Sequence, residues 1–164
     1  MRLQDDGIVL KFSAAAVLIY LGESMIPKPF PWFRIGLANI LILIALLRYG
    51  FRAGISVATA KVLVGAMLTG SFLTPFFFFT LLGTFASLLV MHLLTMLPFS
   101  IIGISVAGSV THNLVQMLLG VFLFLPLTSI RLLYPILSTL GIGTGLLTGI
   151  IGLKTMRLLY DASG

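Results

Sequence analysis

Charge is scarce in this 164-residue chain, and cysteine is absent. Only 9% of the residues are charged and 59% are hydrophobic. A soluble domain would carry about a quarter charged residues, so this composition places the chain among membrane proteins. The lack of cysteine excludes disulfides, thiolate metal sites and cysteine nucleophiles. The net charge of +6 comes without the basic, aromatic-interleaved patch that nucleic-acid binding needs, so no nucleic-acid partner is expected.

Long apolar runs take the place of charge. A helix needs about 20 residues to cross the hydrocarbon core of a bilayer, and six segments reach or approach that length. The predicted fold class is therefore an all-α integral membrane protein, with residues 1–164 forming a single membrane domain. Its six transmembrane helices are expected at about 9–26, 32–48, 53–70, 75–97, 100–125 and 131–153.

The second of these segments is short and follows a proline-rich stretch. Residues 27–34 read PKPFPWFR, which predicts a stiff loop because proline lacks an amide hydrogen and restricts the residue before it. The uncharged part that follows, residues 35–47, makes about 20 Å of helix against a hydrocarbon core of about 30 Å. Such a segment points either to a transporter's binding site or to a tilted helix in thinned lipid, and the sequence leaves both open.

Basic residues near the helix ends predict the orientation. With the N-terminus inside, six Lys and Arg residues fall on the cytoplasmic side and three fall on the outer side. Because cytoplasmic loops carry the excess of Lys and Arg, we expect a multi-pass protein of the cell membrane with both termini in the cytoplasm.

One lysine lies inside an apolar segment. Lys61 is about nine residues from either end of the segment 53–70, where a lysine costs about 2.5–3.5 kcal/mol to insert. It could pair with Glu23, the one acid at membrane depth, or it could contact an anionic ligand. It could also extend to the membrane surface, but its stem would then have to span about half of the bilayer. We favour the pair or the ligand.

Three polar side chains gather in the fifth segment, where residues 108–118 read GSVTHNLVQML. His112 and Gln116 are four positions apart, and Asn113 and Gln116 are three apart. All three therefore fall within about 100° of a helix's circumference. This polar stripe either forms an interhelical hydrogen-bond network or faces a solute cavity.

Two further residues are candidates for solute contact. Asn39, in GLANI, is a lone amide in the second segment, and such an amide often links helices at a gain of about 0.6 kcal/mol. Arg34, Lys28 and Arg131 fall on the predicted outer side. They are either ordinary loop charges or the entrance for an anionic solute, because Arg and Lys attract phosphate and carboxylate.

The sixth segment carries a stripe of glycines at a spacing of four. Gly141, Gly145 and Gly149 would share one helix face, and small residues on one face let another backbone approach closely. We interpret the stripe as helix packing rather than as part of a solute site.

Several stretches resemble a known family. GLANI at 36–40, SFLTPFFFFTLLGTFASLLVM at 71–91 and SIIGISVAGSVTHNLVQML at 100–118 resemble the Gx transporter family, also labelled "heptaprenyl diphosphate synthase component I". The resemblance runs from about Lys11 to Leu153, and GISVAGSVTHNLVQ is its most specific part. That family is similar to the substrate-binding S components of energy-coupling factor transporters.

The resemblance implies a six-helix bundle whose first loop acts as a lid, with PKPFPWFR in the lid position. It also implies docking onto a transmembrane coupling subunit and two cytoplasmic ATPases. S components commonly dock through an Ala-x-x-x-Ala pattern on the first helix, where this chain has the small residues Ser13, Ala14, Ala15 and Ala16. The pattern itself is not met, because Val17, Leu18 and Tyr20 occupy the four-residue offsets.

The sequence lacks the residues that a prenyl diphosphate synthase uses for catalysis. Prenyl chain elongation uses DDxxD motifs to hold magnesium and diphosphate, but Asp5-Asp6 is the chain's one acidic pair and no aspartate follows it in register. The chain also lacks the GxxxxGK[ST] loop of an ATPase. No catalytic residue, cofactor or metal site is expected.

Three functions remain as hypotheses. In the leading one, the chain is the solute-binding membrane subunit of an energy-coupling factor type uptake transporter for a small anionic or amphipathic solute. An isoprenoid or quinone precursor is suggested by the family label. The solute site of this transporter subunit would contain Lys61, His112, Asn113, Gln116, Asn39 and Arg34. The second is a nonenzymatic accessory subunit of heptaprenyl diphosphate or quinone metabolism. The third is a membrane electron-transfer component using His92 and His112.

Overall fold

The computed structural model describes residues 3–27 and 36–161, and this part of the chain is mostly helical, without a strand. Its elements are α1 (Leu3–Met25), α2 (Asn39–Tyr49), α3 (Phe51–Leu68), α4 (Pro75–Thr95), α5 (Ile101–Leu123), the short 3₁₀ helix η1 (Leu127–Ser129) and α6 (Ile130–Asp161). Five helices are long and apolar enough to cross a membrane, and α2 is apolar but shorter. The prediction of an all-α membrane protein is confirmed.

Three helices differ clearly from the predicted bounds. The first was expected from about residue 9, but α1 begins at Leu3. The second was expected from residue 32, but α2 begins at Asn39 after a turn in which Gly36 has a φ of +84°. Residues 28–35, which hold most of the PKPFPWFR stretch, lie outside the described residues. The sixth was expected to end at 153, but α6 continues to Asp161. Lys154 and Arg157 do not end the helix, because charged residues that leave the hydrocarbon core remain good helix formers.

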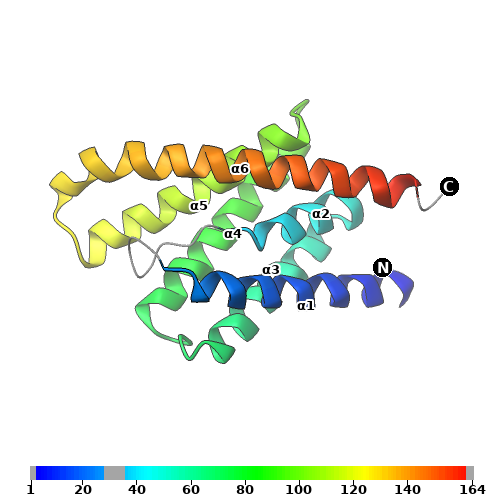
Figure 1. Cartoon of the computed structure of the whole chain (residues 1–164), viewed down its shortest axis with the longest axis horizontal. Helices are drawn as coiled ribbons and strands as arrows, with labels where there is room; N and C mark the ends of the chain where they lie inside the picture. The colour runs from blue at the N-terminus through cyan, green and yellow to red at the C-terminus, as the bar shows by residue number, and fades with distance from the viewer. Residues whose placement is uncertain (1–2, 28–35, 162–164) are drawn as a thin grey trace.

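Most helices pack with their neighbours along the chain, but α1 packs chiefly against α3. α6 lies along α5, α5 against α4, and α1 against α3, while α2 contacts α1, α3, α4 and α6. Figure 1 shows α2 between α1 and α6, and shows that α1 begins and α6 ends at the same end of the long axis. Six crossings of a membrane would return the chain to the side on which it began.

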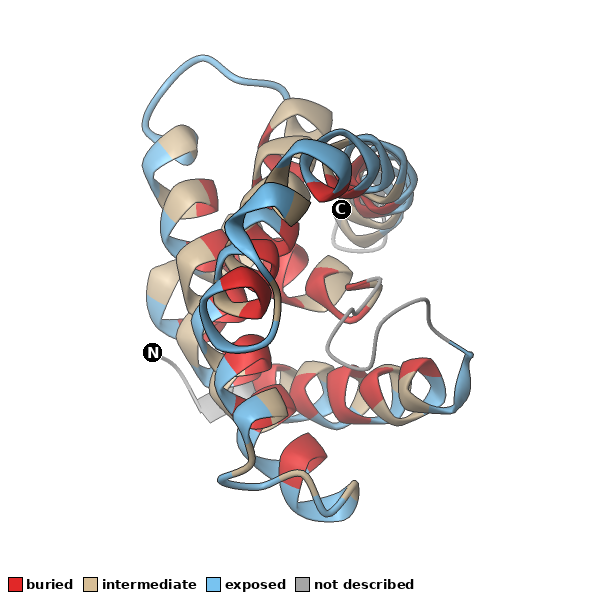
Figure 2. Ribbon diagram, turned by 90° about the vertical axis from the view of Figure 1, so that its left-hand side faces the viewer, coloured by how far each residue is buried: buried red, intermediate tan, exposed pale blue. Residues whose placement is uncertain are grey.

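The short helix α2 is the central element. Between Asn39 and Arg48 its sequence, ILILIALL, is apolar on every face, and a helix that is hydrophobic all round is a buried one. Its buried residues are Asn39, Ile42, Leu43, Ile44, Ala45 and Leu46. Figure 2 shows the buried residues gathered on the sides of helices that face one another. The one polar residue buried in α2, Asn39, is therefore held in the interior of the bundle.

Candidate functional site

The candidate site is built around the ammonium group of Lys61, in the middle of α3. Only 2% of Lys61 is exposed. Its Nζ donates to Asn39 Oδ1 of α2 at 2.7 Å and to Thr84 Oγ1 of α4 at 3.2 Å. The ammonium thus lies between three helices rather than at the lipid surface, which contradicts the extended-lysine interpretation. A buried charge is tolerated only when its hydrogen-bonding capacity is met, and these two oxygens contribute to that.

The start of α2 is fixed from α1 as well as from α3. Glu23 is 3% exposed, and its Oε1 accepts a hydrogen bond from the backbone N–H of Leu37, in the turn before α2. The N–H of Asn39 donates to Gly36 O at 2.9 Å. Because the first N–H groups of a helix lack partners inside it, a carboxylate here is favourable. One acid from α1 and one lysine from α3 therefore bind residues that are two positions apart at the start of α2.

A row of small and hydroxyl residues on α4 completes this region. Thr80, Thr84 and Ser87 are each 1% exposed, and Gly83 is buried beside them. Sequence reasoning missed this row, and only Thr84 among the three reaches Lys61. The signal was present as hydroxyls at spacings of four and three in an otherwise apolar helix. A threonine is a weak signal, because its hydroxyl often bonds its own helix, as Thr80 does to Phe76 O at 3.2 Å.

His112 and Gln116 of α5 face the same side, toward α4. Both are buried, and His112 Nε2 and Gln116 Nε2 are 3.0 Å apart. A β-carbon placed on Gly83 would stand 3.0 Å from His112 Nδ1, so the imidazole packs directly on this glycine. Because Gly83 is the neighbour of Thr84 in α4, the imidazole lies close to the helix that also contacts Lys61.

Asn113 points to a different neighbour. It is also 2% exposed, but its Nδ2 donates to Leu137 O of α6 at 3.0 Å. The stripe expected from the sequence is therefore buried along its whole width, yet it is divided between two helices. An arc of about 100° is wide enough to meet two neighbours, so His112 and Gln116 face α4 while Asn113 joins α5 to α6.

The α5–α6 interface is formed by close backbone contact. A β-carbon on Gly145 would stand 2.5 Å from Val106 Cα, a distance that real atoms do not adopt. The same holds to a lesser degree along the stripe, where Gly141 lies against Val110 and Gly149 against Ile102. The hydroxyls of Ser105 and Thr148 meet across this interface at 2.7 Å.

The remaining predicted residues lie elsewhere. On α1, Ser13 and Ala16 are buried, Ala15 is half-buried and Ala14 is exposed. Ser13 and Ala14 border a shallow groove of about 400 Å³ between α1 and α3. Arg34 lies outside the described residues.

The two histidines have different partners. His92 of α4 stacks on Phe51 of α3, with ring centroids 4.1 Å apart, whereas His112 is hydrogen-bonded to Gln116. Among residues 3–27 and 36–161, no group of three or more His, Cys, Asp or Glu side chains could hold a metal ion. The groups that contact Lys61, Asn39 Oδ1 and Thr84 Oγ1, are hydrogen-bond acceptors.

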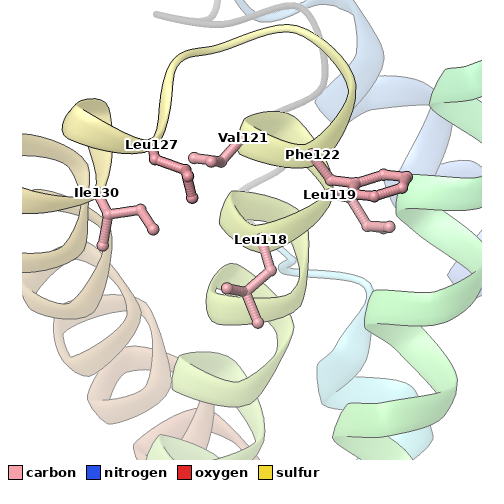
Figure 3. Close-up of a pocket in the computed structure, with 6 residues that line it drawn as sticks. All are labelled: Leu118, Leu119, Val121, Phe122, Leu127 and Ile130. Atoms are coloured by element: carbon pink, nitrogen blue, oxygen red, sulfur yellow. The ribbon is translucent and has the colours of Figure 1, made fainter.

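A second hollow lies at the turn from α5 to α6, away from the polar residues. It has a volume of about 590 Å³, and its lining is wholly apolar (Figure 3): Leu118, Leu119, Val121, Phe122, Leu127 and Ile130. Sequence reasoning did not anticipate this groove, because it depends on how η1 folds back over the end of α5.

Comparison with known proteins assigns the family. The family model described as heptaprenyl diphosphate synthase component I matches residues 12–155. No curated protein and no solved structure matches the chain. Since the match covers most of the sequence, the chain belongs to this family, as its motifs predicted.

Proposed function

We propose that this member of the heptaprenyl diphosphate synthase component I family is a nonenzymatic membrane subunit that binds the anionic group of a small solute at Lys61. The observation that carries the proposal is a lysine ammonium buried in the interior and donating to the neutral oxygens of Asn39 and Thr84. An anionic oxygen would be a stronger acceptor for the same donor, because charge-assisted hydrogen bonds are about twice as strong as neutral ones.

The surroundings of Lys61 favour an amphipathic ligand. His112, Gln116 and Asn39 supply further polar groups within the bundle, while apolar residues of α2, α3 and α4 form the hydrophobic core. A binding site typically combines an apolar lining with a few polar groups that fix orientation. A carboxylate or phosphate at Lys61 with an apolar body between the helices would use both kinds of surface, as an isoprenoid or quinone precursor would. Asn113, and Arg34 in the stretch before α2, would contribute to orientation and entry.

The subunit's working form would be the solute-binding component of an energy-coupling factor type uptake system in the cell membrane. The short central helix supports this, because broken or short membrane segments carry the binding sites of many transporters. Both termini would be cytoplasmic. A transmembrane coupling subunit would dock at Ser13, Ala14, Ala15 and Ala16, and cytoplasmic ATPases would supply the energy, since the sequence lacks their phosphate-binding loop.

A second function is favoured by the description of the family. A "component I" of a heptaprenyl diphosphate synthase would be an accessory subunit that anchors a soluble synthase to the membrane. Because the chain lacks DDxxD motifs, such a synthase would bring its own magnesium-binding aspartates. In this role, the Lys61 site would bind the diphosphate group of the synthase's product, and not the anionic group of an imported solute.

Extraction of the bound small molecule tests the site. Purified protein would be denatured and the released compounds compared by mass spectrometry between the wild type, Lys61→Met and a control, Lys154→Met. Lys154 is an exposed lysine of α6. We expect an acidic compound in the wild type and in Lys154→Met, and at least tenfold less of it in Lys61→Met, the factor corresponding to about 1.4 kcal/mol. Equal recovery from Lys61→Met would refute the assignment of the site.

Partner capture separates the two functions. The tagged chain would be isolated in mild detergent from its own host, and the captured proteins identified by peptide mass spectrometry. A coupling subunit together with ATPases supports uptake. A synthase subunit with DDxxD motifs, captured without an ATPase, supports the accessory role and overturns uptake.

A further inference from the structure

The apolar groove at the α5–α6 turn is open at the surface of the bundle. It lies beside the last two turns of α5, where Phe122 is 84% exposed, and under η1, where Leu127 is 77% exposed (Figure 3). Within the membrane no water competes for such a surface. An unfilled apolar hollow would forfeit dispersion contacts with its lining, so a hydrocarbon chain is its natural occupant.

One basic residue directly follows the lining of this groove in the chain. Arg131 follows the lining residue Ile130 in the first turn of α6, and it is exposed. It is also the one Asp, Glu, Lys or Arg between Lys61 and Lys154. A guanidinium binds a phosphate oxygen pair in a fixed geometry, and the N-terminal end of a helix adds partial positive charge. The charge at the groove is therefore complementary to an anionic headgroup.

We propose that this groove binds one acyl chain of an anionic bilayer phospholipid whose phosphate headgroup contacts Arg131. An apolar hollow next to one cation matches a molecule with an apolar chain next to one anion. Bilayer lipid is favoured over a prenyl diphosphate because it surrounds the groove at a far higher concentration. This lipid site is separate from Lys61 and stands whether or not the solute site is correct.

Quenching of a single tryptophan by brominated lipids tests the proposal. Trp32 is the chain's one tryptophan, so Trp32→Phe provides a silent background and Phe122→Trp places a fluorophore in the groove. The protein would be reconstituted in vesicles that mix brominated phosphatidylglycerol or brominated phosphatidylcholine with its unbrominated form. We expect phosphatidylglycerol to associate about fivefold more strongly, the factor for about 1 kcal/mol per basic residue near anionic lipid.

Two matched variants decide whether the preference belongs to Arg131. When Arg131→Gln is added to the Phe122→Trp protein, the two brominated lipids should quench the fluorophore equally. With Arg131→Lys instead, part of the preference for phosphatidylglycerol should remain. Phe78→Trp, an equally conservative change at an exposed position of α4, should show no preference in the unaltered Arg131 protein. Equal quenching of the Phe122→Trp fluorophore by both lipids, or a preference that survives Arg131→Gln, would overturn the proposal. Relief of quenching by micromolar farnesyl diphosphate in phosphatidylglycerol vesicles would also overturn it, by identifying a prenyl diphosphate as the occupant.

Discussion

The interior between α2, α3 and α4 and the interface between α5 and α6 hold helices together in opposite ways. In the first, the long side chain of Lys61 bridges the helices through Asn39 and Thr84. In the second, glycines remove side chains, and Gly145 brings two backbones into contact. Lipid tails are as apolar as leucine, so membrane helices associate through close packing and polar contacts rather than through the hydrophobic effect.

Because the two regions associate in different ways, they should be sensitive to different kinds of substitution. The α5–α6 interface has no room, so it should be sensitive to added atoms. In the Lys61 region, polar groups satisfy one another's hydrogen bonds. The protein should therefore lose stability when one partner is replaced by an apolar residue, and lose much less when both partners are replaced. Three sets of variants test this contrast, beginning with the largest expected effect.

Enlarging Gly145 should disrupt the α5–α6 interface most. In Gly145→Leu, the new side chain begins 2.5 Å from Val106 Cα, so the two helices must separate. We expect the free energy of unfolding to fall by about 3 kcal/mol or more, because inserting extra methylenes into a packed core typically costs about 1–3 kcal/mol and a leucine adds a whole side chain. Titration with a denaturing detergent, followed by circular dichroism, measures the change.

The same substitution two residues away is the control. Gly143 is exposed, and a β-carbon there meets nothing within 4 Å. Gly143→Leu should leave the protein as stable as the wild type or up to about 1 kcal/mol more stable, since leucine favours helix over glycine. If both variants lost the same stability, close packing would not be what joins α5 to α6.

Removing one polar partner of Lys61 should have the next largest effect. Asn39→Leu takes away the acceptor at 2.7 Å and leaves a buried ammonium with fewer partners. We expect a loss of about 2–3 kcal/mol, because hydrogen bonds to charged groups contribute about 1.5–3 kcal/mol. The same detergent titration measures it.

The double variant Asn39→Leu with Lys61→Met should recover most of that loss. Replacing both members of a buried polar pair by apolar groups is often nearly neutral. A double variant less stable than Asn39→Leu alone would show that Lys61 serves stability apart from Asn39, and the two regions would then not differ in the way described.

The smallest effect is expected where a polar contact crosses the glycine interface. Ser105 and Thr148 meet at 2.7 Å between α5 and α6. A double-mutant cycle of Ser105→Ala and Thr148→Val should give a coupling energy of about 0.6 kcal/mol, the average for such contacts in membranes. A coupling above about 2 kcal/mol, beyond the range of such contacts, would mean that hydrogen bonds rather than glycines dominate this interface too.

The apolar segments were predictable from the sequence because each helix must be apolar over the thickness of a bilayer. The polar residues were also visible, since Lys61, His112, Asn113 and Gln116 stand out in apolar runs. Their partners were not, because pairing depends on the rotation and order of the helices. Thr84 carries no distinctive signal until α4 is known to lie beside α3, and Asn113 looks equivalent to His112 until α6 is placed.

The position of Lys61 has an electrical consequence. Its ammonium lies near the middle of α3, so an anion that reaches it from outside would cross about half of the membrane's voltage drop. One elementary charge moved through the full drop corresponds to about 2.3 kcal/mol per 100 mV. With the inside negative, a potential of about 100 mV would therefore oppose binding of a monovalent anion by about 1 kcal/mol, and the fixed positive charge of Lys61 would offset that opposition.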